Sequence, residues 1–185
     1  GINGGMAERI VVPERFLIPL DRRVKVEDAF LVEPLAVAVR SLGRAGVTEG
    51  DTVCVVGAGT IGLCCVAVAK YLGATVELES RHSHQLEAGS RLGATEPSSQ
   101  PARIVIEAAG TSSALSWAIE KCQKGGVVGI PSTYWDAVEI PALAMGMKEV
   151  SLIPSVTYGH TTGQRDFDVA MSVMAASPEL GQAVI

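Results

Sequence analysis

A continuous apolar run that leads directly into three closely spaced glycines restricts the fold more than any other feature. Residues 52–56 are rich in valine, and Gly57, Gly59 and Gly62 follow before a helix-forming segment. Gly57 allows a tight strand-to-helix turn, Gly59 lets the backbone approach a pyrophosphate, and Gly62 lets the helix pack close to the strand. The pattern predicts a dinucleotide-binding turn, with the pyrophosphate on unpaired N–H groups at the positive end of the helix dipole.

The same stretch, residues 52–69, is uncharged and long enough to be considered as a membrane-spanning helix. Three glycines within six residues and the valine-rich start argue against that interpretation. Charged residues bound the window at Asp51 and Lys70. A parallel strand buried on both faces produces the same apolar run, so we expect no membrane partner.

The bulk properties favour one compact α/β domain with appendages. The chain has 185 residues, of which 48% are hydrophobic, and a formal net charge of −5. Lys and Arg residues are scattered, so we expect no nucleic-acid partner. The chain begins at Gly1 without a charged-then-apolar signal region, and we expect a cytoplasmic location.

The cysteines and histidines do not form a recognisable metal-binding pattern. No Cys-x-x-Cys pair occurs, and the four cysteines are expected to be buried small hydrophobic residues. His82 and His84 form a His-x-His pair, but no nearby Cys or carboxylate completes a ligand set. His160 lies in a polar stretch that is expected to be a loop. We therefore predict no metal site within this chain.

Strand and helix signals alternate after the turn signal at residues 48–51, which predicts a doubly wound, Rossmann-type parallel sheet with helices on both faces. An irregular segment precedes it, with strand-like runs at 8–12 and 16–20 and helical spacing at 26–42. The expected strands are 52–56, 75–79, 103–108, 126–130 and 150–156, and the expected helices are 61–72, 83–92, 112–121 and 166–176.

One connection is too short for a complete doubly wound sheet. A further edge strand and crossover helix should precede the strand at 103, and a crossover needs about ten to twelve residues or more. Only residues 96–102 are available. Either the strand and helix have been lost, or residues are missing near 95–103. We favour the second explanation, because loss of that strand would expose the edge of its neighbour.

Several motifs in order resemble the medium-chain zinc-dependent alcohol dehydrogenases, in particular the branch that includes sorbitol-like and threonine-like dehydrogenases. The resemblance implies that residues 1–45 are a remaining part of a GroES-like catalytic domain with its connecting helix, and that residues 46–185 are the dinucleotide-binding Rossmann domain of a longer enzyme. It rests on Gly4 to Glu8, Val11 to Pro13, Val32 to Ala38, Gly50-Asp51, Arg91 to Thr95 and Glu107 to Gly110.

The family implies hydride transfer between a small-molecule alcohol, such as a polyol or hydroxy-amino acid, and NAD or NADP, in a homodimer or homotetramer. Its zinc ligands, including a Gly-His-Glu motif, do not occur here, so zinc is expected only in the full-length enzyme. This chain alone is expected to bind cofactor without turnover. Two alternatives remain, a zinc-free quinone or enoyl reductase of the same superfamily and a non-catalytic nucleotide-sensing module.

The choice between cofactors should be made at the end of the second strand. A carboxylate there accepts hydrogen bonds from the ribose hydroxyls, whereas a small hydroxyl followed by Arg favours a 2′-phosphate. Ser80 lies eighteen positions after Gly62 (80 − 62) and Arg81 follows it, so NADP is preferred. A shift of one residue would place Glu79 at the ribose and reverse the preference to NAD.

Glu33 is a candidate catalytic-site residue, because a carboxylate inside an apolar segment is costly unless a metal, a cation or a helix end meets it. It could equally cap a helix or bridge domains. The resemblance places it at the catalytic zinc of the intact enzyme, directly or through water. The remaining candidate cofactor-binding positions are Thr60 and Ile61 in the glycine turn and Gly129 at a strand end. The resemblance also implies that Gly110 lies near the cofactor, that Ile130 contacts the nicotinamide, and that backbone from Ser155 to Thr157 holds the carboxamide.

Overall fold

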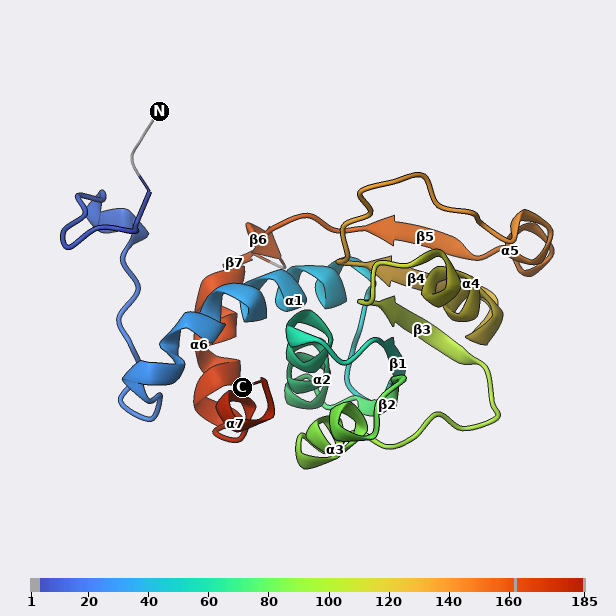
Figure 1. The fold of residues 1–185 in the computed structure, drawn as a ribbon, viewed down its shortest axis with the longest axis horizontal. Helices are drawn as coiled ribbons and strands as arrows, with labels where there is room; N and C mark the ends of the chain where they lie inside the picture. The colour runs from blue at the N-terminus through green and yellow to red at the C-terminus, as the bar shows by residue number, and fades with distance from the viewer. Residues whose placement is uncertain (1–3, 162, 185) are drawn as a thin grey trace.

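A five-stranded parallel sheet forms the centre of the molecule in the computed structural model, which describes residues 4–161 and 163–184. The strand order is β2-β1-β3-β4-β5, and Figure 1 shows the helices arranged on both sides of the sheet. This is the predicted doubly wound, Rossmann-type class. The strands are β1 (Thr52–Val56), β2 (Thr75–Glu79), β3 (Ala102–Glu107), β4 (Cys122–Ile130) and β5 (Ser151–Pro154).

The helices and short elements complete the described chain. A two-stranded antiparallel hairpin is formed by β6 (His160–Thr161) and β7 (Gln164–Arg165). Two 3-10 helices, η1 (Glu14–Phe16) and η2 (Val26–Leu31), precede the first α-helix. The α-helices are α1 (Val32–Arg44), α2 (Thr60–Tyr71), α3 (Ser83–Arg91), α4 (Ser112–Lys121), α5 (Ala142–Lys148), α6 (Asp166–Ala176) and α7 (Leu180–Val184).

Alternation along the strands divides the apolar core between the two faces of the sheet. On one face Val53 and Val55 of β1 join a large cluster with residues of α1, α2 and α6. On the other face Cys54 and Val56 join a smaller cluster with the buried side of α4. Because both faces are covered, β1 is buried from Val53 to Val56, which explains its uninterrupted apolar sequence.

β2 is the edge strand of the sheet. Beyond it, an additional parallel strand begins at Thr95 but extends for only one residue. Thr95 makes a parallel bridge with Glu77, accepting from the N–H of Leu78 and donating to the carbonyl of Val76. If the parallel ladder continued, the N–H of residue 97, two positions after Thr95, would donate to the carbonyl of Leu78. That residue is Pro97, which has no N–H, so the ladder cannot continue.

A buried ion pair holds the short connection between Thr95 and β3. Lys121 Nζ lies 3.0 Å from Glu77 Oε2, and both side chains are less than 10% exposed. The same ammonium donates to the carbonyl oxygens of Ser98 and Gln100. The end of α4 therefore fixes the segment that occupies the place of the expected strand and crossover helix.

The segment before the sheet differs from the prediction. Residues 8–12 and 16–20 form no strand, and Val11 is 94% exposed, because no strand of the described residues lies beside them to complete a ladder. The helical spacing at 26–42 is divided between η2 and α1, which begins at Val32. Pro34 is tolerated in the first turn of α1, where backbone N–H groups have no intrahelical acceptor.

The predicted elements from β1 onward agree with the structure within a few residues, apart from the strand at 150–156, which is shorter, and β4, which begins four residues earlier. The structure adds α5, α7 and the β6–β7 hairpin, which the sequence pattern did not reveal, and His160 lies in that hairpin rather than in a loop. None of the described helices is both long enough and apolar enough to cross a bilayer.

Candidate nucleotide-binding site

The glycine turn joins the carboxyl end of β1, which lies between β2 and β3, to α2, with Gly57 and Gly62 in close contact. Gly57 has φ of +95°, and a Cβ there would lie 2.8 Å from the Cβ of Ala109. A Cβ on Gly62 would overlap the carbonyl oxygen of Gly57. The conformation and the packing thus require glycine at both positions.

Gly59 is different, because a Cβ there would meet no atom within 4 Å. It is the N-cap of α2, and Thr60 and Ile61 form the first turn of that helix. The first N–H groups of a helix have no intrahelical acceptor and carry partial positive charge. Open space in front of those groups is what a pyrophosphate needs, so the site fits the group that the sequence motif implies.

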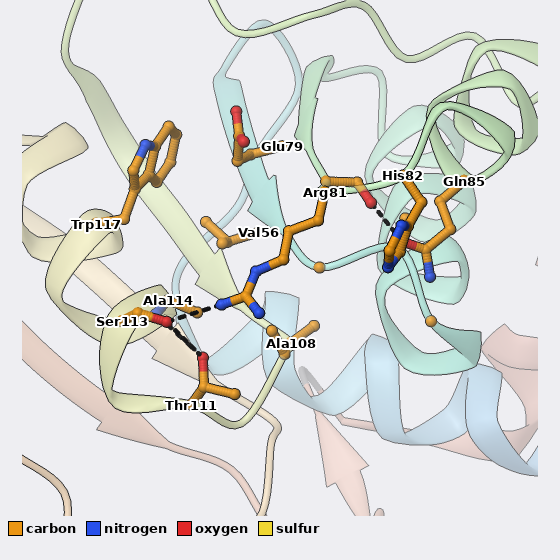
Figure 2. A pocket seen from close by; sticks show the side chains of 15 residues that line it. Val56, Glu79, Arg81, His82, Gln85, Ala108, Thr111, Ser113, Ala114 and Trp117 are labelled. Atoms are coloured by element: carbon orange, nitrogen blue, oxygen red, sulfur yellow. Dashed lines mark hydrogen bonds between the residues drawn. The ribbon is translucent and has the colours of Figure 1, made fainter.

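A cavity of about 480 Å³ opens beside this turn and lies within the usual size range of ligand pockets. Five parts of the fold line it, namely the glycine turn, the end of β2, the start of α3, the end of β3 and the first half of α4 (Figure 2). The lining residues are Val56, Gly57, Ala58, Gly59, Glu79, Ser80, Arg81, His82, Gln85, Ala108, Ala109, Thr111, Ser113, Ala114 and Trp117.

The end of β2 brings a carboxylate, a hydroxyl and a guanidinium to this cavity. Glu79, Ser80 and Arg81 all line it, so the structure places both the predicted NADP pair and its competitor in one pocket. The Ser80 hydroxyl donates to Gln85 Oε1 over 2.5 Å. Arg81 extends across the pocket and donates to Ser113 Oγ over 2.9 Å, as Figure 2 shows.

A fully buried carboxylate at the end of β3 fixes the opposite wall. Glu107 Oε1 accepts from the backbone N–H groups of Ala109 and Gly110, each over 2.8 Å. Its Oε2 accepts from the hydroxyls of Ser132 and Tyr134, which follow β4. Burial and the bond to Glu107 raise the pKa of Tyr134, so its hydroxyl remains a donor. Glu107 therefore ties the loop after β4 to the pocket wall.

The other predicted cofactor residues lie outside the cavity, at the carboxyl ends of β3, β4 and β5. Gly110 follows β3, while Gly129 and Ile130 end β4. Ser155 is buried and its N–H donates to the carbonyl of Ile130. Thr157 has φ of +52°, a strained left-handed conformation for a β-branched residue. The cavity thus gathers only part of the predicted set.

Glu33 does not have the environment that made it conspicuous in the sequence. Its side chain is exposed in the first turn of α1, so the burial penalty that would call for a metal or cation does not arise. Acidic side chains are favourable at that end of a helix. Within residues 4–161 and 163–184, no three His, Cys, Asp or Glu side chains gather as a metal site.

The cysteines and the histidine pair have structural positions. All four cysteines are buried and free, and burial raises the pKa of Cys64 to about 12. His82 and His84 stack on one another with ring centroids 5.5 Å apart, and His82 lines the nucleotide cavity. Neither set contributes to a metal centre in the described part of the chain.

Two features of the site were not found from the sequence. The sequence indicates only that Glu107 lies at a strand end, because its hydroxyl partners are 25 and 27 positions away. Trp117 also lines the cavity. The only sequence signal for it is the rarity of aromatic residues, which are 4% of the chain.

Known proteins resemble this chain in sequence and in fold. D-xylulose reductase A of Aspergillus oryzae is 28% identical over 195 residues, which cover 94% of this chain and 53% of that protein. Galactitol-1-phosphate dehydrogenase of Escherichia coli is 25% identical in sequence, with a TM-score of 0.80 over 94% of this chain and 56% of that one. No protein-family model matches the chain.

A five-stranded parallel sheet with a glycine turn after β1, beside the point where the strand order reverses, defines a Rossmann-type dinucleotide-binding domain. The chain spans about half the length of the curated relatives that it matches. Its sequence and fold are similar to those of medium-chain zinc-dependent dehydrogenases over the half of those proteins that forms the cofactor-binding domain.

Structures with the same fold are known with either nicotinamide cofactor. One from Sinorhizobium meliloti 1021, with 22% identity and a TM-score of 0.70 over 83% of this chain and 51% of that one, is bound to NADP. One from Escherichia coli CFT073, with 24% identity and a TM-score of 0.75 over 90% of this chain and 52% of that one, is complexed with NADH. These two proteins thus bind different nicotinamide cofactors.

Proposed function

We propose that this chain is the NAD(P)-binding domain of a medium-chain dehydrogenase that acts on a polyol or another small alcohol. The observation that carries the proposal is the pocket formed where the glycine turn meets the end of β2 and the start of α4. In this assignment residues 46–185 are the dinucleotide-binding domain, and residues 1–45 belong to the catalytic domain and its connecting helix. The intact protein would be a homo-oligomer.

The turn and the first turn of α2 would hold the pyrophosphate. The N–H groups of that first turn have no intrahelical acceptor and would bind the phosphate oxygens, and the missing side chain of Gly59 leaves room for them. A bound nicotinamide ring would supply the hydride acceptor for oxidation of the alcohol. The role of this domain is to bind and orient that ring.

We assign the choice of cofactor to Arg81, with NADP preferred. The guanidinium now donates to the neutral hydroxyl of Ser113, and a 2′-phosphate would offer stronger, charge-assisted bonds in the same place. Glu79 opposes this preference, because its carboxylate would accept from an unmodified ribose and repel a phosphate. Ser80 leaves space without adding a charge.

The nicotinamide half would lie over the carboxyl ends of β3, β4 and β5, across the switch point of the sheet from the cavity. There Gly110, Gly129 and Ile130 would border the ring. Backbone groups of Ser155 and Thr157 would hold its carboxamide. The strained backbone at Thr157 supports a binding role, because strain of this kind is concentrated at functional sites.

Zinc chemistry is not assigned to any described residue, because these residues provide no ligand set. Glu33 would reach a catalytic metal only together with ligands from another part of the enzyme. The exposed position of Glu33 at the start of α1 leaves it free to do so.

Calorimetric titration of this chain with NADP and NAD tests the proposal. We expect the wild type to bind both, with NADP bound more tightly. Arg81→Ala should weaken NADP by about 10- to 100-fold, the loss expected for a charge-assisted bond, and should leave NAD nearly unchanged. Glu79→Ala should weaken NAD instead.

Arg103→Ala is the matched control, since this arginine pairs with Asp51 at the start of β1, outside the cavity. It should change neither affinity. Failure of the wild type to bind either dinucleotide would overturn the proposed function. Oxidation of a polyol by this chain alone would overturn the view that catalysis needs residues beyond it.

A further inference from the structure

We propose that Trp117 is the base-stacking residue of the cavity and that the base it recognises is adenine. This inference rests on the proposed function and adds a specific residue to it. Trp117 is the largest side chain that lines the cavity. It would hold the adenine end of the dinucleotide.

The position of Trp117 on α4 makes its ring a wall of the cavity. Trp117 lies one turn after Ser113 and Ala114 on α4, and all three line the cavity. The first two are small, so they leave space in front of the indole. In Figure 2 the indole lies on the α4 side, while Arg81 reaches across from the end of β2.

The side chain of Trp117 packs against the smaller apolar cluster of the core. Trp117 is half-buried and packs against the apolar cluster that contains Val56, Ala114 and Ala118. A ring supported on one side and open to a cavity on the other loses little conformational freedom when a ligand stacks on it. Tryptophan combines a large apolar surface with this rigidity, which is why aromatic rings serve as platforms for bases.

The rest of the cavity offers little else for the flat face of a base. Apart from Val56, His82 and Trp117, its lining consists of glycine, alanine, small hydroxyl residues and the polar side chains Glu79, Arg81 and Gln85. These groups suit a ribose and phosphates. The apolar faces of a base need a larger surface, and Trp117 provides the largest one.

The location of the cavity identifies which base would stack there. It includes the end of β2, where the ribose-recognising residues of this fold lie, but no residue from β4 or β5. A dinucleotide that crosses the glycine turn would therefore place its adenosine half here. Its nicotinamide would lie on the other side of the turn.

Fluorescence offers a direct test, because the chain has two tryptophans and the second, Trp135, is 91% exposed and lies outside the cavity. In Trp135→Phe only Trp117 emits. We expect AMP to quench this emission and nicotinamide mononucleotide to leave it unchanged. In Trp117→Phe, where only Trp135 emits, AMP should have no effect.

Affinity measurements complete the test. Trp117→Leu keeps apolar bulk but removes the aromatic face, and we expect it to weaken AMP binding by about tenfold or more. Trp117→Phe should restore affinity to within about threefold of wild type, because it restores the aromatic face. Unquenched Trp117 emission in the presence of bound AMP, or wild-type AMP affinity in Trp117→Leu, would overturn the inference. The proposed function would still stand in that case if the wild type bound NADP. Loss of all dinucleotide binding in the wild type would overturn both.

Discussion

Replacement of Glu107 by Gln should loosen the wall of the nucleotide site and destabilise the fold at the same time. The carboxylate accepts four hydrogen bonds, two from backbone N–H groups and two from hydroxyls. Bonds to a charged group contribute about 1.5–3 kcal/mol each, and neutral bonds about 0.5–1.5. In Glu107→Gln the two backbone donors can remain on the amide oxygen, but the amide nitrogen then faces two hydroxyls that were donors.

A loss of about 1 kcal/mol at each of the four bonds gives about 4 kcal/mol, and the lower cost of burying a neutral amide offsets part of it. We therefore expect the free energy of unfolding to fall by about 2 kcal/mol, or Tm by about 4–8 °C. Urea unfolding followed by circular dichroism measures the first quantity, and titration with NADP should show weaker binding. Tyr134→Phe removes one donor and should cost less. A change below about 0.5 kcal/mol in Glu107→Gln would refute the reasoning.

Two further predictions concern the glycine turn and the buried ion pair. Gly62→Ala should destabilise the fold and abolish NADP binding, because its Cβ would overlap Gly57. Gly59→Ala should have the Tm of the wild type and weaken only NADP binding, because its Cβ would meet no other atom. Equal Tm values for the two variants would contradict this prediction. Lys121→Met should lower the free energy of unfolding in urea by about 3–5 kcal/mol, because Glu77 remains buried without its partner. Lys124→Met is the control, since it breaks the exposed pair with Glu149 and should lower the same quantity by less than about 1 kcal/mol. Burial raises the pKa of Glu77, but hydrogen bonds from Ser98 and Lys121 and the charge of Lys121 outweigh burial and leave the pKa below 4.5. The carboxylate therefore contributes stability above the unfolded-state pKa that is lost as pH falls through the lower folded-state pKa, and Lys121→Met should flatten this acid dependence, which unfolding at pH 3 and pH 7 would reveal.

The central strands could be predicted from sequence because burial on both faces leaves an unambiguous signal. Residues 52–56 are one example, and their predicted bounds match β1. The same reasoning failed at Val11, where a β-branched residue has no neighbouring strand to pair with. Local pattern identifies a segment that can form a strand, but a ladder also requires a partner.

Side-chain networks were less accessible than the backbone motif. The glycine turn is contained within six residues, so its geometry can be read from spacing alone. The bonds from Ser132 and Tyr134 to Glu107 and the bond from Arg81 to Ser113 join residues 25 to 32 positions apart. Such pairs become neighbours only when the crossovers of the sheet are formed. The resemblance to dehydrogenases supplied the family, but it did not supply these partners.

Pro97, which ends the one-residue strand beside β2, also affects whether copies of this protein aggregate. An open sheet edge presents N–H and C=O groups that can pair with a strand from another molecule and start aggregation. At β2 the bridge to Thr95 occupies part of that edge, and Pro97 comes next with a rigid ring and no donor. Natural sheets use proline in this way to discourage edge-to-edge assembly. Pro97 thus protects colloidal solubility in a sheet whose outer strand is otherwise incomplete.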